Sequence, residues 1–250
     1  MIFLNVLIVR LYSQKKNVKI EELLQKYEDA DYDSNVEAIF AAKTYVQNLQ
    51  KALPKFRGDV LDIGAGDGAF LSEAKKSFAD KAVGIEPSSV AIKFNNNAEI
   101  KLLNIAIENF KTEDKFDLVT CFQTIEHLNN PKEFLTKISN YLLKGGFIAI
   151  TCHNRSSVVN KLLKDKSPIF DIEHLQVFTV EGIEILFRKL GLEIVYSKSY
   201  KNSYPFHYWI KLAPIPSTIK NFILKYSHFF SFKVAINVGN HLIIGRLNDL

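Results

Sequence analysis

The segment of this chain whose residue types most clearly indicate chemistry is residues 60–71, VLDIGAGDGAFL. A run of β-forming residues stops at three glycines in alternate positions and continues as a helical pattern. Gly64, Gly66 and Gly68 permit a tight turn and let a ligand approach the backbone, because they carry no Cβ. The helix that follows directs its free N–H groups to the same point. The pattern is typical of a nucleotide-cofactor loop, although a strand-to-helix turn can also require glycine for steric reasons alone.

Two carboxylates accompany this loop. Asp62 lies in the predicted strand just before the glycines, and Glu86 ends a second short strand after them. Glu86 follows the glycines by roughly 20 residues, which is the spacing at which a carboxylate contacts ribose hydroxyls. An acid at the start of a helix, stabilised by the helix dipole, is the alternative interpretation of Glu86. Dinucleotide-dependent enzymes share this arrangement, so these residues leave the class of cofactor open.

The order of further segments narrows the class. The loop is followed by GIEPS at 84–88, FDLVTC at 116–121, IEHL at 125–128 and LLKGGF at 142–147. Over about residues 35–200 this set resembles the class I S-adenosylmethionine (SAM) dependent methyltransferases. TCHNRS at 151–156 and EHLQVFT at 173–179 resemble the small-molecule branch that includes ubiquinone-biosynthesis O-methyltransferases and sugar-modifying enzymes.

The resemblance implies a set of SAM-binding residues. The glycine loop holds the methionine part of SAM, Glu86 holds the ribose, and residues after the third and fourth strands frame the adenine and the methionine. At Ile105 the sequence departs from the family, which usually has an acid there to contact the adenine amino group. The implied cofactor-binding residues are Asp62, Gly64, Ala65, Gly66, Glu86, Pro87, Ile105, Ala106, Phe122 and Gln123.

Histidines are the candidate catalytic bases. Transfer of a methyl group from a sulfonium depends mainly on positioning of the acceptor, but a hydroxyl acceptor must lose a proton. Histidine, with an unperturbed pKa of about 6.5, suits that task near neutral pH. His127 and His174 match family positions and are the predicted bases, with helix capping as the alternative role of His127. His153 stands where related sequences usually have proline.

The sequence leaves several functions open. O-methylation of a sugar, a quinone precursor or a lipid-linked intermediate is the first choice, and a non-catalytic SAM-binding sensor or scaffold is the alternative, because the adenine acid is missing. An NAD-dependent oxidoreductase is disfavoured by the segments at 125–128 and 142–147. Glu126 and Glu173 show no recognised ligand spacing, so no metal site is expected.

Composition agrees with one domain over residues 1–250. The hydrophobic content of 47% is ample for a core, and the net charge of +5 is spread without a basic, aromatic-rich cluster, so no nucleic-acid partner is expected. Cys121 and Cys152 lack paired metal spacing, and a reducing cytoplasm is the simplest compartment. Within the N-terminal extension, 1–34, the first twelve residues are apolar but lack signal-peptide features and are too short to span a bilayer.

Alternating strand and helix patterns predict an α/β fold with parallel strands. The family resemblance implies a Rossmann-like, doubly wound, seven-stranded sheet with an antiparallel last strand and helices on both faces. Helical spacing occurs at about 37–53, 68–78, 131–143 and 179–190. Asn130 and Thr179 are helix start signals, and the Gly145-Gly146 pair and Gly191 are helix stop signals. The predicted strands lie near residues 60, 83, 101, 118 and 147 and at 192–196 and 241–247.

An aromatic-rich insertion, 201–237, precedes the last strand. Pro214 and Pro216 divide its central part, 204–232, into two short helical pieces. Its apolar stripe consists of Ile219, Phe222, Ile223, Tyr226 and Phe230. We expect it to pack on the sheet edge or to form a lid that adds an apolar wall to the acceptor pocket, and contact with a membrane surface is the second interpretation.

Overall fold

The computed structural model describes residues 34–164, 167, 169, 174–212, 215–227 and 232–248. A seven-stranded sheet lies at its centre, with strand order β3-β2-β1-β4-β5-β9-β6. The first five strands are parallel, and β9 is antiparallel to both β5 and β6. This is the predicted fold. The strands are β1 (Gly58–Ile63), β2 (Ala79–Glu86), β3 (Lys101–Asn104), β4 (Phe116–Phe122), β5 (Leu142–His153), β6 (Leu192–Ser199) and β9 (Asn240–Leu247).

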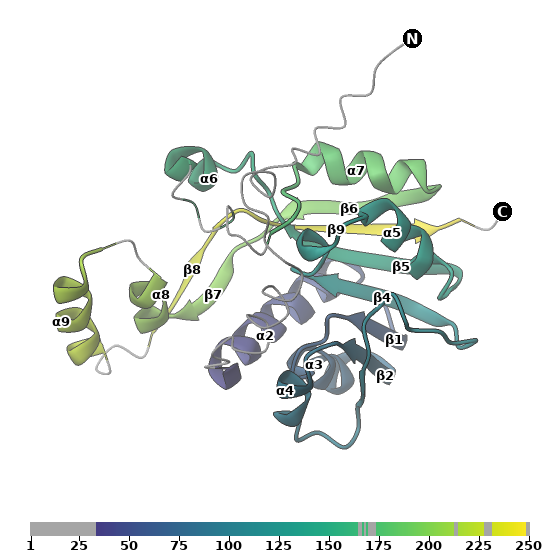
Figure 1. Ribbon diagram of the computed structural model, residues 1–250, viewed down its shortest axis with the longest axis horizontal. Helices are drawn as coiled ribbons and strands as arrows, with labels where there is room; N and C mark the ends of the chain where they lie inside the picture. The colour runs from purple at the N-terminus through teal and green to yellow at the C-terminus, as the bar shows by residue number, and fades with distance from the viewer. Residues whose placement is uncertain are drawn as a thin grey trace, which may run out of the picture.

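Helices cover both faces of the sheet because successive strand residues bury their side chains on opposite sides. Val60 belongs to the core cluster that includes residues of α2 and α3, whereas Leu61 belongs to the cluster that includes residues of α5 and α7. Figure 1 shows these two helical layers on either side of the sheet. The helices of the domain are α2 (Ser34–Ala52), α3 (Ala69–Ser77), α4 (Ser89–Lys93), η1 (Ile125–His127), α5 (Pro131–Ser139), α6 (Val158–Leu163) and α7 (Val180–Lys189).

The end of α5 differs from the sequence prediction. Asn130 begins the helix as expected, accepting a hydrogen bond from the Glu133 N–H, but the helix ends at Ser139 and not near residue 143. Leu142 instead pairs with Phe116 in the sheet. The glycines taken as a helix stop lie inside β5, where a Cβ on Gly146 would come within 2.9 Å of the Leu143 carbonyl oxygen. Gly146 permits a close contact between strands and Gly145 has a positive φ of 74°, so both glycines serve the sheet, and the glycine signal misplaced the end of the helix.

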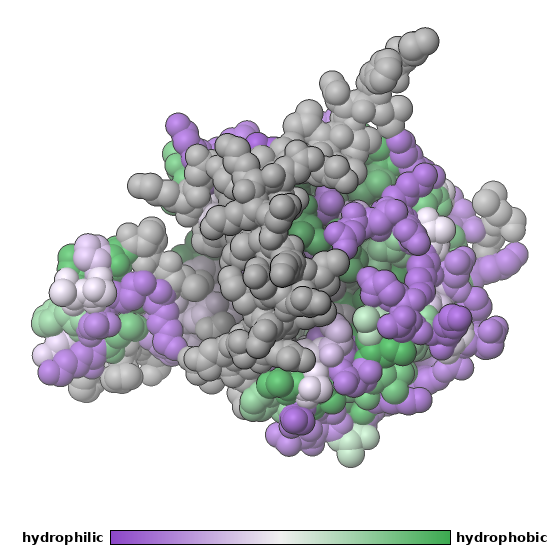
Figure 2. All heavy atoms as spheres, viewed as in Figure 1, coloured by the Kyte–Doolittle hydropathy of each residue, from purple (hydrophilic) through white to green (hydrophobic). Residues whose placement is uncertain are grey.

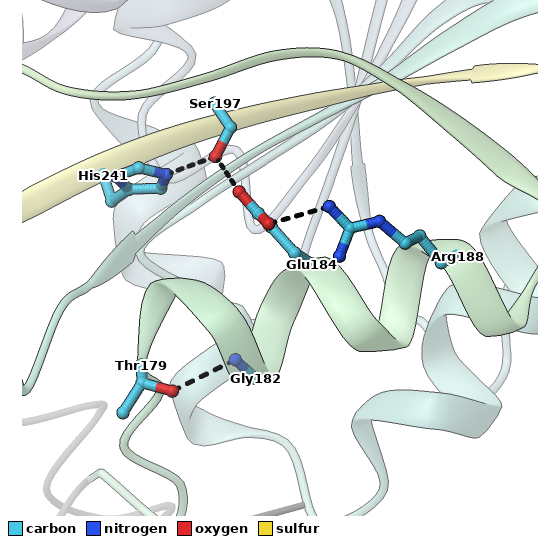
Figure 3. Close-up of polar contacts among 6 residues, drawn as sticks. All are labelled: Thr179, Gly182, Glu184, Arg188, Ser197 and His241. Atoms are coloured by element: carbon cyan, nitrogen blue, oxygen red, sulfur yellow. Dashed lines mark hydrogen bonds and ion pairs between the residues drawn. The ribbon is translucent and has the colours of Figure 1, made fainter.

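Helix α7 is attached to the sheet by polar contacts as well as by its apolar face. The Gly182 N–H donates to Thr179 Oγ1 at 3.0 Å, which confirms the predicted N-cap. Glu184 accepts hydrogen bonds from Ser197 Oγ on β6 at 2.6 Å and from Arg188 at 3.0 Å (Figure 3). Ser197 also lies 2.9 Å from His241 Nε2 on β9, so the network joins one helix to two strands.

Residues 202–236 form an arm that leaves the sheet between β6 and β9. It consists of a two-stranded antiparallel ribbon, β7 (Asn202–Pro205) and β8 (Lys233–Ile236), which carries α8 (Phe206–Leu212) and α9 (Ser217–Ser227). Figure 1 shows the two helices projecting away from the domain. The two short helical pieces are confirmed, whereas the ribbon was not predicted, because each of its strands has only four residues.

Several sequence expectations lie outside the described residues. These are the extension up to residue 33, Glu173, Pro214 and Phe230. Across the ranges that the structure describes, no helix combines the length and the apolar character needed to cross a lipid bilayer.

Candidate functional site

The glycine loop follows β1 and needs its glycines for two different reasons. Gly64 and Gly68 have φ values of 75° and 79°, and a Cβ at either would collide, at 2.3 Å from Thr124 Oγ1 and 2.5 Å from Ile100 respectively. Gly66 has φ 55°, but a Cβ there would meet no atom within 4 Å. Steric packing therefore explains Gly64 and Gly68. Gly66 borders open space, as expected where a ligand approaches the backbone.

Glu86 connects this loop to the end of β2. Its side chain is buried, and its two carboxylate oxygens accept hydrogen bonds from the Gly66 N–H at 3.0 Å and the Ser88 N–H at 2.8 Å. Burial raises the pKa of Glu86, while these two N–H groups oppose the shift. Each carboxylate oxygen has a second acceptor position, so the group can also bind a vicinal pair of hydroxyls. The contact with Ser88, the N-cap of α4, links Glu86 to the start of that helix, and its role in holding a ribose stays a prediction.

Asp62 is the more strongly perturbed carboxyl. It is buried in β1 and accepts a hydrogen bond from Thr120 Oγ1 on β4 at 2.6 Å. Burial raises its pKa to about 7, with a smaller contribution from the charge of Glu86. A carboxyl in this state responds strongly to a nearby positive charge, which favours ionisation.

The segment after β4 lies over the same edge of the sheet. The ring of Phe122 stacks on Tyr45 of α2 at 4.4 Å and meets Phe70 of α3 edge-on at 4.7 Å. Gln123 has φ 52°, unusual for a residue with a side chain, and its N–H donates to the Thr151 carbonyl at 2.9 Å. Positive φ values of this kind concentrate at functional sites.

The segment after β3 is held by an unexpected residue. The Asn104 side-chain amide donates to the carbonyls of Glu86 and Pro87 at 3.1 and 2.8 Å, fixing the turn that carries the exposed Pro87. The Ile105 N–H donates to the Glu86 carbonyl at 3.2 Å, and Ile105 and Ala106 are half-buried. Asn104 was missed, although a polar residue at a strand end is a signal for such a role.

The structure brings together the three histidines selected from the sequence. His127 comes from η1, His153 from the end of β5 and His174 from the segment before α7. Their ring centroids lie 4.9 Å apart for His127 and His174 and 5.4 Å apart for His153 and His174. We call these residues the histidine cluster.

Hydrogen bonds orient two of these rings. His174 Nδ1 lies 3.0 Å from the Ile169 carbonyl oxygen, which can only accept. His153 Nδ1 lies 2.8 Å from Asn240 Oδ1. Both contacts place the proton of the neutral ring on Nδ1 and leave Nε2 unprotonated. Burial lowers the pKa of His153, which keeps that ring neutral.

Glu126 lies beside the histidine cluster. It is 1% exposed, and Oε1 accepts a hydrogen bond from the His153 N–H at 2.7 Å, while Oε2 has no hydrogen-bond partner among the described residues. Burial raises the pKa of Glu126, while the His153 N–H and the charges of His174 and His127 oppose the shift. The part of the chain described here contains no group of three or more acidic, histidine or cysteine side chains arranged to hold a metal ion.

The residues around the glycine loop and the histidine cluster both lie at the carboxyl edge of the parallel strands. The glycine loop, Glu86 and Gln123 follow β1, β2 and β4, and the histidine cluster lies at the ends of β4 and β5. The strand order reverses between β1 and β4, which is where open α/β sheets bind ligands. Fold and site together define a Rossmann-like domain with a nucleoside-cofactor loop beside a group of titratable side chains.

Comparison with known proteins agrees with this class. A family model described as a methyltransferase domain matches residues 32–197, and the chain belongs to this family. The predicted recognition as a SAM-dependent methyltransferase is thereby confirmed at the level of family and fold.

Curated relatives include two ubiquinone biosynthesis O-methyltransferases. The mitochondrial enzyme of Dictyostelium discoideum is 31% identical, over 46% of this chain and 42% of that protein. The enzyme of Glaesserella parasuis serovar 5 is also 31% identical, over 43% of this chain and 50% of that protein. The matched regions therefore span half or less of these relatives.

Solved structures share the fold. A SAM-dependent methyltransferase from Thermotoga maritima has a TM-score of 0.58 at 21% identity, covering 92% of this chain and 98% of that chain. The plantazolicin methyltransferase BpumL, solved with a pentazolic desmethylPZN analog and SAH, has a TM-score of 0.58 at 19% identity, covering 92% of this chain and 91% of that chain.

Proposed function

We propose that this protein methylates a hydroxyl group of a small molecule with SAM as the methyl donor. The observation that carries the proposal is the convergence of His127, His153 and His174 at the edge of the sheet that bears the glycine loop. The O-methyltransferases among the relatives support the choice of a hydroxyl acceptor. A quinone precursor, a sugar or a lipid-linked intermediate fits this class.

The residues around the glycine loop fit the cofactor. Open space at Gly66, acceptor oxygens on Glu86 and the fixed ring of Phe122 match a ligand that combines a ribose with a chain of moderate polarity. When bound, SAM supplies a methyl group on a positively charged sulfur that is already a good leaving group. The residues of the chain therefore need to hold the acceptor in line and to remove its proton.

Proton removal falls to the histidine cluster. The unprotonated Nε2 of His174 takes the proton of the acceptor hydroxyl as its oxygen forms the new bond to carbon, and His127 is the second candidate for this role. The charge of Glu126 favours the protonated form of either ring. Glu126 is a positioning residue in this scheme, because it acts through the histidines.

A non-catalytic SAM sensor is the second candidate function. The observation that favours it is Ile105, which brings an apolar side chain to the position where the family usually has an acid, and whose N–H already donates to the Glu86 carbonyl. A sensor needs the glycine loop and Glu86 but does not need the histidine cluster.

Single and double alanine variants of His127 and His174 test the proposal. Transfer of label from methyl-labelled SAM is measured with prenylated catechols, sugars and lipid-linked sugars as acceptors, and SAM affinity by calorimetry. Loss of the base should lower turnover by about 10²–10⁴ at nearly unchanged SAM affinity. Full turnover in the double variant would remove the histidines from the reaction. SAM binding without transfer to any acceptor would favour the sensor.

A further inference from the structure

The arm is attached to the domain next to the candidate site. Its ribbon follows the end of β6 and leads into the start of β9, and the first residue of β9, Asn240, pairs with His153 at the end of β5. Asn240 Oδ1 contacts His153 Nδ1 at 2.8 Å, and Asn240 Nδ2 donates to Asn202 Oδ1 at 3.2 Å. Asn202 and Asn240 are buried. Two hydrogen bonds through buried Asn240 and Asn202 therefore connect the histidine cluster to the first strand of the arm.

The arm has internal contacts that hold its helices in place. Trp209 of α8 donates its indole N–H to the Val234 carbonyl of β8 at 2.8 Å, and the rings of Phe206 and Phe232 stack at 5.2 Å. Lys220 of α9 donates to the Lys211 carbonyl at the end of α8 at 2.8 Å. This hydrogen bond links α9 to α8.

One face of α9 exposes apolar side chains. Ile219, Phe222 and Tyr226, spaced three and four residues apart, are 51%, 66% and 46% exposed. The rings of Phe222 and Tyr226 contact each other at 5.2 Å. Figure 2 shows hydrophobic and hydrophilic surface side by side on the arm, at the left of the view.

A second helix exposes an apolar pair in the same way. Val158 and Leu162 of α6, one helical turn apart, are 73% and 76% exposed. Helix α6 follows β5 at the carboxyl edge of the sheet, and a Cβ on Gly239, just before β9, would contact Ser157 and Asn160 at 2.6 and 2.8 Å. Figure 1 shows α6 at the end of the domain from which the arm projects.

The charge of this region has one sign. Residues 194–248 contain six lysines and one arginine but no aspartate or glutamate. The positive charge of this segment is therefore larger than the net charge of +5 of the whole chain. Lys211, Lys220, Lys225 and Lys233 belong to the arm. Exposed aromatic and aliphatic side chains among lysines are the composition of helices that lie in the headgroup region of anionic bilayers.

We propose that the arm docks this protein on the surface of an anionic lipid bilayer. The apolar side chains of α9 enter the headgroup region, while Lys211 and Lys225, which are exposed on the two helices of the arm, contact the lipid phosphates. The positive charge argues against a second copy of the chain as the occupant of this face, because two such arms repel each other. Docking does not rest on the proposed function. Combined with it, docking places the acceptor site next to the membrane and favours an acceptor with a lipid portion.

Co-sedimentation with vesicles tests this proposal in the absence of SAM. The full chain is mixed with vesicles of equal parts phosphatidylglycerol and phosphatidylcholine or of phosphatidylcholine alone, at low and high salt. We expect binding to the anionic vesicles that falls as salt is added, since headgroup attraction is screened. Phe222→Asp should lower binding by about tenfold or more, and so should Lys211→Gln combined with Lys225→Gln.

Leu143→Asp is the matched control. Leu143 is 41% exposed and lies near the start of β5, at the opposite edge of the sheet, so the same charge is introduced far from the arm. Its binding should equal that of the wild type, and thermal unfolding checks that each variant is folded. Absence of vesicle binding, or equal binding to neutral vesicles, would overturn the proposal. A dimer that is detected by sedimentation velocity and is dissociated by Phe222→Asp, together with no vesicle binding, would also overturn it, because a second copy of the chain would then occupy this face.

Discussion

Gly66 and Glu86 are the two residues of the candidate cofactor site that a hydrogen bond joins directly. The backbone N–H of Gly66 donates to Glu86, and its positive φ directs that N–H to the carboxylate. The space beside Gly66 is open, so its side of the loop is available to the cofactor.

Gly66→Val should abolish SAM binding while the domain still folds. The added side chain occupies the open space and puts a β-branched residue at positive φ, at a cost of about 1–2 kcal/mol in the free energy of unfolding. Gly191→Val is the control, because Gly191 also has a positive φ, 73°, and open space around its Cβ but follows α7. Calorimetry with SAM and thermal unfolding should show a similar loss of stability in both variants and a loss of affinity only in Gly66→Val. Equal affinities would remove Gly66 from the site.

The raised pKa of Asp62 predicts a pH-dependent affinity for SAM. Because this pKa is about 7 in the free protein and SAM is a cation, binding should favour the ionised carboxylate. SAM affinity should therefore rise between pH 6 and pH 8 and then level off. Asp62→Asn should remove that part of the rise, as measured by calorimetry at three pH values. Identical pH profiles for the two proteins would contradict the assignment of Asp62 to the cofactor site.

At the scale of elements, sequence periodicity located most of the secondary structure but not all of its limits. Helix α7 was predicted with its N-cap, because the signals for both are local in the chain. The end of α5 was misplaced and the ribbon of the arm was missed, because strand pairing decides both. The Thr120 partner of Asp62 was also missed, since those residues are 58 positions apart and meet only across paired strands.

The network around α7 predicts how stability depends on pH. Burial lowers the pKa of His241, so the unfolded chain binds the proton more readily than the folded protein. The contribution of this histidine is therefore present above its unfolded pKa, near 6.5, and is lost as pH falls below it. His241→Asn should lower the free energy of unfolding at pH 8 by more than at pH 5.5, as measured by urea unfolding. An equal deficit at both values would show that His241 does not titrate in this way.

At the scale of the whole molecule, the parallel sheet brings cofactor loop, histidine cluster and arm to one edge. The order of motifs along the chain predicted the cofactor loop and indicated each of the three histidines as a separate candidate. It did not reveal that the rings of His127, His153 and His174 are neighbours or that buried Asn202 and Asn240 connect them to the arm, because these contacts join segments distant in sequence. The role of the insertion as a lid stays a prediction.

Calorimetric titration of SAM and, separately, of NAD into the wild type and Glu86→Ala tests whether the glycine loop and Glu86 form a SAM site. It needs no knowledge of the acceptor. We predict that SAM binds the wild type and NAD does not, and that Glu86→Ala weakens SAM binding by about 1.5–3 kcal/mol, the range for hydrogen bonds to a charged group. Absence of SAM binding, preferential binding of NAD, or unchanged SAM affinity in a folded Glu86→Ala variant would show that these residues do not form a SAM site.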